Sequence, residues 1–322
     1  MLPVFSAFGR RLVALVGTAL ALGLAACGSG DEGAAGPATT SPPAAPAAFP
    51  VTIDAANGEL TLEHRPTRII SLSPTATESL FAIGAGAQVA AVDDQSNYPS
   101  EAPRTKLSGY TPNAEAIAGY EPDLVVAAFD PGGLVGSLER LEIPVLLQPA
   151  AQDLDDAYEQ IEQLGAATGR GRAAADLVAS LRSRIAGLVE KARGSEGGVS
   201  VYHELGPDYY SATSKTFIGS IYRLLGLRNI ADGAGGEAPD YPQLSAEYIL
   251  AEDPDLIVLA DTKCCGQTPE TVAARPGWKG IGAVENGAVV PVRDDVASRW
   301  GPRILDFVRL VGRKVAELRA SR

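Results

Sequence analysis

The feature that most constrains the fold of this chain is an internal repeat. Residues 113–128 read NAEAIAGYEPDLVVAA, and residues 245–260 read SAEYILAEDPDLIVLA. A repeat of this length is the signature of a structural unit that the chain builds twice. Identical residues recur 132 positions later for each of Glu115, Ile117, Pro122, Asp123, Leu124 and Val126.

Each copy of the repeat predicts a short helix, a break and a buried strand. The Pro-Asp pair ends the helix, because the residue before a proline avoids the helical region. The unbroken run of Val, Ile and Leu that follows is typical of a parallel strand covered on both faces. The sequence therefore predicts the α/β class, with two Rossmann-like lobes of similar plan.

A long helix is predicted between the two copies, over residues 172–193. Leu177, Leu181, Ile185 and Leu188 recur at helical spacing, and Gly194 is a natural stop. A helix of this length spans roughly 33 Å, about the width of a small domain. We expect it to brace the two lobes.

The N-terminus predicts an export signal followed by a tether. Arg10 and Arg11 precede a 15-residue apolar run, 12–26, which is shorter than a membrane span. The run ends at Cys27 in the sequence LAAC, which resembles the lipobox of bacterial lipoproteins. Residues 1–27 are thus predicted to be a lipoprotein signal peptide, and the Gly-, Ala- and Pro-rich segment 28–50 a flexible linker.

Composition narrows the class of partner and the number of domains. The 322 residues suit about two domains, and 46% hydrophobic residues suffice for their cores. The formal net charge of −12 argues against nucleic acid as a partner. The predicted folded parts are an N-terminal lobe at 51–150, connecting helices at 151–194 and a C-terminal lobe at 195–322.

Catalytic and metal-binding motifs are sparse. His64 and His203 are the only histidines, and no nucleophile elbow, phosphate loop or histidine pair at metal-ligand spacing occurs in the sequence. This predicts no catalytic residues, no bound metal ion and no resident cofactor. The alternative is an anchored extracellular enzyme, or a cell-wall interaction module, on the same two-lobe fold.

Several segments together carry a resemblance to a known family. RIISLSPTATESLFAIGAG at 68–86, the two repeat copies, the helix between them and the lipobox are similar to the iron-siderophore and vitamin B12 class of ABC-importer solute-binding proteins. The resemblance implies two lobes joined by one rigid helix, with the ligand in a cleft between them. It further implies a monomeric, lipid-anchored, extracytoplasmic receptor. Its ligand would be a corrinoid or a ferric siderophore, and its partner an ABC permease dimer with its ATPase.

The predicted loops contain several aromatic residues and one arginine that suit a bulky, partly apolar chelate. The alternative for each is simple packing within its loop. The resemblance implies that Tyr110, Tyr241 and Trp300 stack on the ligand. The candidate ligand-binding residues are Tyr98, Tyr110, Tyr209, Tyr210, Tyr241, Arg299 and Trp300.

Three pairs of residues have further candidate roles. Glu115 and Glu247 stand early in the two repeat helices, where the helix dipole favours a carboxylate; the resemblance implies that they dock on the permease. Thr75 and Glu78 have capping-box spacing, which is favoured over a functional role for Glu78. Cys264 and Cys265 are expected to form a strained disulfide, the alternatives being a soft-metal or cobalt contact and free thiols.

Overall fold

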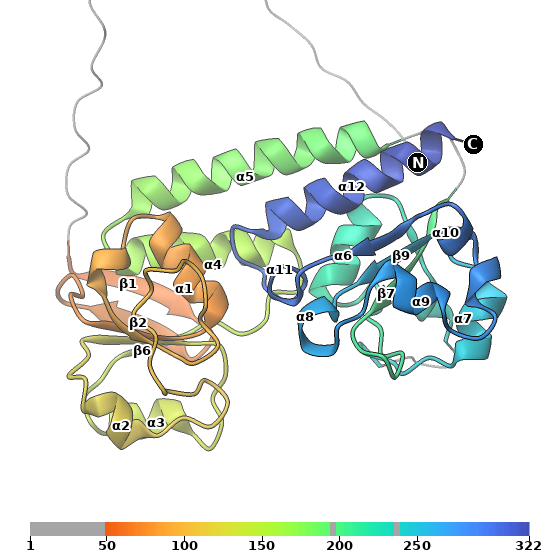
Figure 1. Cartoon of the computed structure of the whole chain (residues 1–322). Helices are drawn as coiled ribbons and strands as arrows, with labels where there is room; N and C mark the ends of the chain where they lie inside the picture. The colour runs from red at the N-terminus through yellow and green to blue at the C-terminus, as the bar shows by residue number, and fades with distance from the viewer. Residues whose placement is uncertain (1–48, 194–197, 235–238, 322) are drawn as a thin grey trace, which may run out of the picture. The chain divides into compact units, whose positions relative to one another are not determined.

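The computed structural model describes residues 49–193, 198–234 and 239–321 and contains two parallel sheets (Figure 1). A small antiparallel hairpin precedes them, and Gly58, which follows its turn and begins the second strand, has a φ of 107°. Gly58 adopts this conformation without the steric cost of a Cβ. The hairpin strands are β1 (Val51–Ala55) and β2 (Gly58–Leu62).

The first lobe is built on a four-stranded sheet of order β4-β3-β5-β6, in which every pair of neighbours is parallel. Each connection between consecutive strands passes through helical turns, as parallel pairing requires. The strands are β3 (Ile69–Leu72), β4 (Val89–Val92), β5 (Leu124–Ala127) and β6 (Val145–Leu147). The helices are α1 (Pro74–Ala82), a 3-10 turn at Gly86–Gln88, α2 (Ala114–Ala118) and α3 (Leu134–Glu139).

The second lobe repeats this plan on a parallel sheet of order β10-β9-β7-β8. Its strands are β7 (Ser200–Glu204), β8 (Arg228–Asn229), β9 (Leu256–Leu259) and β10 (Val289–Pro291). The helices of this lobe are α6 (Phe217–Leu224), α7 (Ala246–Glu252), α8 (Thr262–Cys265), α9 (Pro269–Ala273), α10 (Gly282–Glu285) and α11 (Asp294–Ala297), with 3-10 turns at Ile230–Gly233 and Trp278–Gly280.

The repeat seen in the sequence is also a repeat of hydrogen bonds. Asp123 of the Pro-Asp break accepts from the backbone N–H of Arg68 at 2.8 Å, and Asp255 accepts from the backbone N–H of Ser200 at the same distance. Each carboxylate thereby ties the start of its own strand to the start of the neighbouring one. The prediction of two equivalent α/β units is confirmed at the level of single atoms.

Three long helices form a layer outside the sheets: α4 (Leu154–Ala167), α5 (Gly171–Ala192) and α12 (Ile304–Ala320). Helix α5 packs against both α4 and α12, and Figure 1 shows it running alongside α12. Its buried stripe is centred on Val178, Leu181, Ile185 and Val189. The predicted helix is confirmed, but its apolar face is rotated, because Leu177 and Leu188 are only half-buried. Gly194, the predicted stop, lies outside the described residues.

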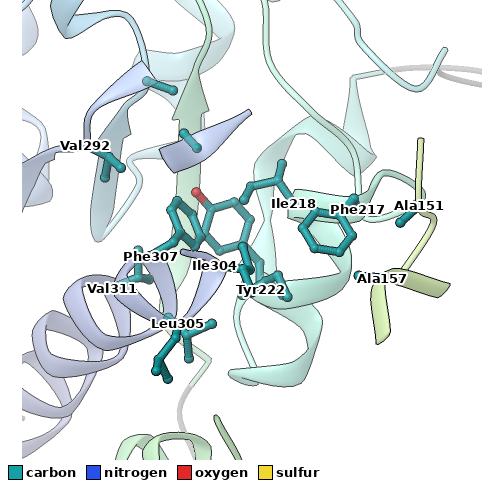
Figure 2. Packing of buried hydrophobic residues seen from close by; sticks show 14 of the residues in the cluster. Ala151, Ala157, Phe217, Ile218, Tyr222, Val292, Ile304, Leu305, Phe307 and Val311 are labelled. Atoms are coloured by element: carbon teal, nitrogen blue, oxygen red, sulfur yellow. The ribbon is translucent and has the colours of Figure 1, made fainter. Parts of the chain in front are cut away.

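One contiguous apolar core runs through both lobes and the outer helices. In Figure 2, Tyr222 of α6 meets Phe307 of α12, and their rings lie 5.9 Å apart. Phe217 at the start of α6 lies beside Ala151 and Ala157, which belong to the α4 region of the chain. Because this interior is close-packed, moving one lobe relative to the other would disrupt buried apolar contacts.

The signal peptide predicted at 1–27, including Cys27, lies outside the described residues, as does most of the linker predicted at 28–50. Among the residues that are described, no helix is both long enough and apolar enough to cross a membrane.

The stability of the fold should depend on pH through His203 of β7. This side chain is fully buried, and burial lowers its pKa from 6.5 to about 4. Its Nδ1 lies 2.6 Å from the Tyr222 hydroxyl, while Nε2 has no partner. The unfolded chain therefore binds an extra proton as pH falls from 6.5 to 4, and the free energy of unfolding falls with it.

We expect wild-type protein to lose about 3 kcal/mol more stability between pH 7 and pH 4 than a His203→Gln variant loses. Urea unfolding across this pH range measures the difference. Parallel curves for the two proteins would contradict the assignment.

Candidate functional site

The predicted aromatic residues gather in loops that follow the carboxyl ends of the parallel strands. This is the edge where open α/β sheets bind ligands. Tyr110 is 66% exposed and Tyr241 is 55% exposed, which are large fractions for such side chains. Tyr98 and Tyr210 are also exposed. Packing in the protein interior therefore does not explain why these four positions are aromatic, as it would for a core residue.

The first lobe presents a stacked aromatic pair. The ring of Tyr110 lies 5.5 Å from that of Phe129, with 27° between their planes. Phe129 is exposed and stands two positions after the end of β5. Phe129 was not among the predicted site residues. Its position directly after a predicted buried strand is the sequence feature that could have identified it.

The second lobe brings Tyr210 and Tyr241 together through backbone pairing of two loops. The backbone N–H of Ser211 donates to the carbonyl of Pro242 at 2.9 Å, and a β-bridge joins Tyr210 to Gln243. Tyr209 differs from its neighbour. It is half-buried and stacks on Trp278 at 5.7 Å, so the packing interpretation describes its environment.

Trp300 and Arg299 make contacts within the protein that their sequence does not suggest. The indole Nε1 of Trp300 donates to Gln160 Oε1 of α4 at 2.7 Å. Arg299 is buried, and its guanidinium donates to Glu78, to the side chains of Asn97 and Asp295 and to a backbone carbonyl. In this structure the donors predicted for a ligand are directed at protein oxygens.

Glu78 is the centre of this buried network, and its predicted role as a helix cap is wrong. Helix α1 begins at Pro74, and its cap is Ser73, whose Oγ accepts from the Ala76 N–H at 3.3 Å. The carboxylate of Glu78 is buried. It accepts from Arg299 at 2.8 Å and from Arg303 at 2.8 and 2.6 Å.

The network joins α1 in the first lobe to the segment from α11 to α12 in the second. Asp295 extends it, because its Oδ1 accepts from Arg299 and its Oδ2 accepts from Asn97 at 3.0 Å. Although burial opposes this effect, Arg299 and Asn97 hold the pKa of Asp295 below its usual value. Asp295 therefore stays ionised and holds the two lobes together at neutral pH.

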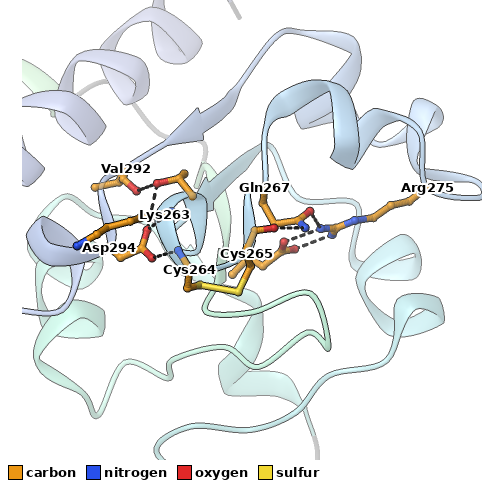
Figure 3. The surroundings of a disulfide bond; sticks show 9 residues. Lys263, Cys264, Cys265, Gln267, Arg275, Val292 and Asp294 are labelled. Carbon is orange, nitrogen blue, oxygen red and sulfur yellow. Dashed lines mark hydrogen bonds and ion pairs between the residues drawn. A yellow bond between two sulfur atoms is a disulfide. The ribbon is translucent and has the colours of Figure 1, made fainter.

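The adjacent cysteines lie in α8, beside this network. Cys264 and Cys265 are exposed and joined by a disulfide (Figure 3). Asp294 accepts from the backbone N–H groups of Lys263 and Cys264 at 2.9 and 2.8 Å. The carboxylate of Asp294 thus holds the backbone of this short helix in place.

A second buried carboxyl group lies directly before α8. Asp261 is fully buried, and neither of its side-chain oxygens has a partner. Burial, followed by the charge of Glu204, raises its pKa to about 7. Arg275 neutralises Glu204 through two hydrogen bonds of 2.6 Å. The charge of Glu204 is thus compensated by Arg275, whereas the raised pKa of Asp261 leaves its carboxyl group partly protonated near neutral pH.

The two predicted docking glutamates occupy equivalent places. Glu115 is in the first turn of α2 and Glu247 in the first turn of α7, and both are exposed. Within the described part of the chain, neither side chain forms an ion pair. Asn113 and Ser245 already cap these helices, which leaves both carboxylates free to meet a partner.

Two other features of the described residues lie apart from the predicted ligand-binding residues. No group of three or more His, Cys, Asp or Glu side chains in this part of the chain could hold a metal ion. A groove of about 770 Å³ is lined by Tyr158, Arg182 and Leu224 of α4, α5 and α6. It contains none of the predicted ligand-binding residues.

Comparison with known proteins decides the family. The sequence pattern described as periplasmic binding protein matches residues 69–296, most of the chain. This chain belongs to that family. The family is one of binding proteins, and the two-lobe α/β fold predicted from the repeat is confirmed by its solved members.

Three relatives of this periplasmic binding protein are informative. An uncharacterized ABC transporter substrate-binding lipoprotein, YvrC of Bacillus subtilis, is 32% identical over 270 residues, 81% of this chain and 83% of that one. A cobalamin-binding protein of Halobacterium salinarum is 33% identical over 267 residues, 80% and 72% of the two chains. The crystal structure of the periplasmic vitamin B12 binding protein BtuF of Vibrio cholerae is 27% identical, with a TM-score of 0.65, covering 78% and 97%.

The buried network predicts a large cost for neutralising Glu78. A Glu78→Gln variant leaves Arg303 without its counter-charge and Arg299 with Asp295 alone, and breaking a buried ion pair typically costs about 3–5 kcal/mol. Urea unfolding measures this cost. As a matched control, Glu190→Gln on α5 removes an exposed ion pair with Arg193 and should change stability by less than about 0.5 kcal/mol. Equal effects of the two substitutions would refute the structural role of Glu78.

Proposed function

We propose that this protein is the corrinoid-binding component of an ABC importer. The observation that carries the proposal is the set of exposed aromatic side chains at the carboxyl ends of both sheets. Tyr110 and Phe129 form a stacked pair in the first lobe, and Tyr210 and Tyr241 are exposed on two paired loops of the second. Aromatic faces bind a large conjugated ring with little loss of side-chain entropy.

Two considerations favour a corrinoid over a ferric siderophore as the ligand. The relatives found by sequence that are named for a ligand are cobalamin- or vitamin B12-binding proteins, and so is the solved BtuF structure at 27% identity. Solved structures under 25% identical include heme-binding proteins and an Fe3+-hydroxamate transport protein, and these show the shared fold alone. Among the described residues, the aromatic loops also offer no cluster of unpaired arginines that would suit an anionic siderophore, since Arg299, Arg303 and Arg275 are all engaged by carboxylates of the protein. A neutral or weakly charged macrocycle is the better match to this surface.

The proposed receptor acts outside the cytoplasmic membrane. Its predicted signal peptide and Cys27 support export and acylation, and the linker gives the folded part reach from the membrane. A relative described as a substrate-binding lipoprotein supports the same arrangement. We infer that the protein works as a monomer that delivers the ligand unchanged to a permease dimer driven by its ATPase.

Titration with a panel of ligands tests the proposed specificity. Cyanocobalamin and cobinamide should quench tryptophan fluorescence saturably, because Trp300 lies in the segment that links the two lobes, whereas ferric hydroxamates should not. Turnover of any of these compounds would instead favour an enzyme. The absence of saturable corrinoid binding would refute the proposal.

The aromatic side chains should contribute directly to affinity. The truncations Tyr110→Ala, Phe129→Ala and Tyr241→Ala should each weaken cyanocobalamin binding by about 1–3 kcal/mol, as expected for buried aromatic contacts in a complex. Isothermal titration calorimetry measures the change. The control is Leu141→Ala, an exposed apolar residue after α3, which should leave affinity unaltered. Wild-type affinity in all three aromatic variants would exclude this surface as the binding site.

The two exposed glutamates should act in delivery and not in capture. A pair of like charges, one on each lobe, can fix the orientation of the receptor on a two-fold permease. Replacing both Glu115 and Glu247 by Lys should abolish uptake of labelled cyanocobalamin by cells, while purified protein keeps its affinity and thermal stability. Normal uptake by the double variant, or loss of binding in solution, would show that these residues are not the docking pair.

A further inference from the structure

The position of the disulfide in the fold connects it to the ligand-binding surface. Helix α8 directly follows β9, which lies inside the second sheet. The repeat relates Cys264 to Gly132 and Asp261 to Phe129, each 132 positions earlier. The disulfide therefore occupies the second-lobe counterpart of the loop that presents Phe129 in the first lobe.

The disulfide helix also lies at the junction between the lobes. Lys263 Nζ is 3.5 Å from Asp295 Oδ2, and the same oxygen accepts from Asn97 of the first lobe at 3.0 Å. Asn97 immediately precedes Tyr98, one of the exposed aromatic residues. The side chain of Asp295 thus links α8 to the first-lobe loop that carries Tyr98, a candidate ligand-binding residue.

Several polar groups of α8 are used within the protein, while the charged side chain of Lys263 is largely exposed. Asp294 takes the N–H groups of Lys263 and Cys264 as well as the Thr262 hydroxyl (Figure 3). The Cys265 N–H donates to the carbonyl of Asp261 at 3.2 Å. Beside the Lys263 side chain, α8 exposes the rigid Cys264–Cys265 disulfide with its two polarisable sulfur atoms and their methylene groups.

Stabilisation of the fold does not explain this disulfide. A cross-link stabilises a protein mainly by restricting the unfolded chain, and the effect grows with the length of the closed loop. Two adjacent residues enclose no loop. The helix that carries them is already held by Asp294, so the cross-link adds little to the folded state either.

We propose that the Cys264–Cys265 disulfide is part of the ligand-binding surface and contacts the conjugated face of the bound macrocycle. Sulfur makes favourable contacts with conjugated rings, and a rigid disulfide loses no rotamer freedom on binding. The first lobe supplies an aromatic pair for this purpose, and the second lobe supplies sulfur at the equivalent place. This inference rests on the proposed corrinoid function and adds a specific contact to it.

Removing the sulfur surface should weaken capture. A Cys264→Ser/Cys265→Ser variant and a Cys264→Ala/Cys265→Ala variant should each bind cyanocobalamin at least about tenfold more weakly than wild type in calorimetry. The matched control is Glu270→Gln, on the exposed surface of the next helix, α9, which should bind as wild type does. Wild-type affinity in both double variants would overturn the proposal.

A second measurement separates direct contact from an indirect structural effect. Tris(2-carboxyethyl)phosphine attacks one sulfur and breaks the S–S bond, while water supplies the oxygen of the phosphine oxide and the two thiol protons. If the ligand covers the sulfurs, saturating cyanocobalamin should slow this reduction at least about tenfold, as followed by intact mass after alkylation.

The outcomes of the two measurements are distinguishable. Equal reduction rates with and without bound cyanocobalamin would overturn the contact while leaving the proposed function intact. Wild-type protein that binds no cyanocobalamin would overturn both. Weakened binding by the double variants together with ligand protection of the wild-type disulfide would support the contact.

Discussion

The interaction on which the rest of the structure depends is the buried carboxylate of Glu78 between two arginines. Each arginine reaches it from the segment that begins α12, so a residue of the first lobe neutralises charges of the second. Neither charge is tolerable alone in this environment, because an unpaired buried ion costs several kcal/mol. The lobes are therefore held in one arrangement by electrostatics as well as by the apolar core. A binding surface formed by both lobes would therefore already be in place before a ligand arrives.

Much of the fold could be predicted because its determinants are local or periodic. The repeat revealed two equivalent units, since both copies kept the Pro-Asp break and its buried strand. The terminal helix α12 is periodic in the same way: Ile304, Val308, Val311, Val315 and Leu318 recur at helical spacing and are all buried. The buried stripe of α5 lies one position away from the predicted stripe. This helix packs on two neighbours at once, and small residues such as Ala174 are buried together with the large ones.

The site was less predictable, because its contacts join residues far apart in the chain. Glu78 and Arg299 are separated by 221 positions, and nothing near Glu78 distinguishes a cap from an interlobe ion pair. The same limit applies to Arg299, whose sequence context suggests a free donor. Phe129 was missed for a different reason: it directly follows the buried strand of the first repeat copy, whereas the selected aromatic residues lie in predicted loops. The exposed tyrosines were identifiable from their loop positions, but loop position did not distinguish Tyr209, which packs on Trp278.

The apolar cluster that the two lobes share has a consequence for how the chain unfolds. Because this cluster includes residues of β3, α5, β9 and α12, the interior of each lobe continues into the other, although the first lobe also has a separate cluster around Ile70, Val125 and Leu138. A lobe expressed alone would expose a large apolar surface and aggregate, and heat or denaturant should unfold both lobes in one cooperative step. The two copies of the repeat thus share their larger apolar cluster, and proteolytic separation of the lobes would expose it on both.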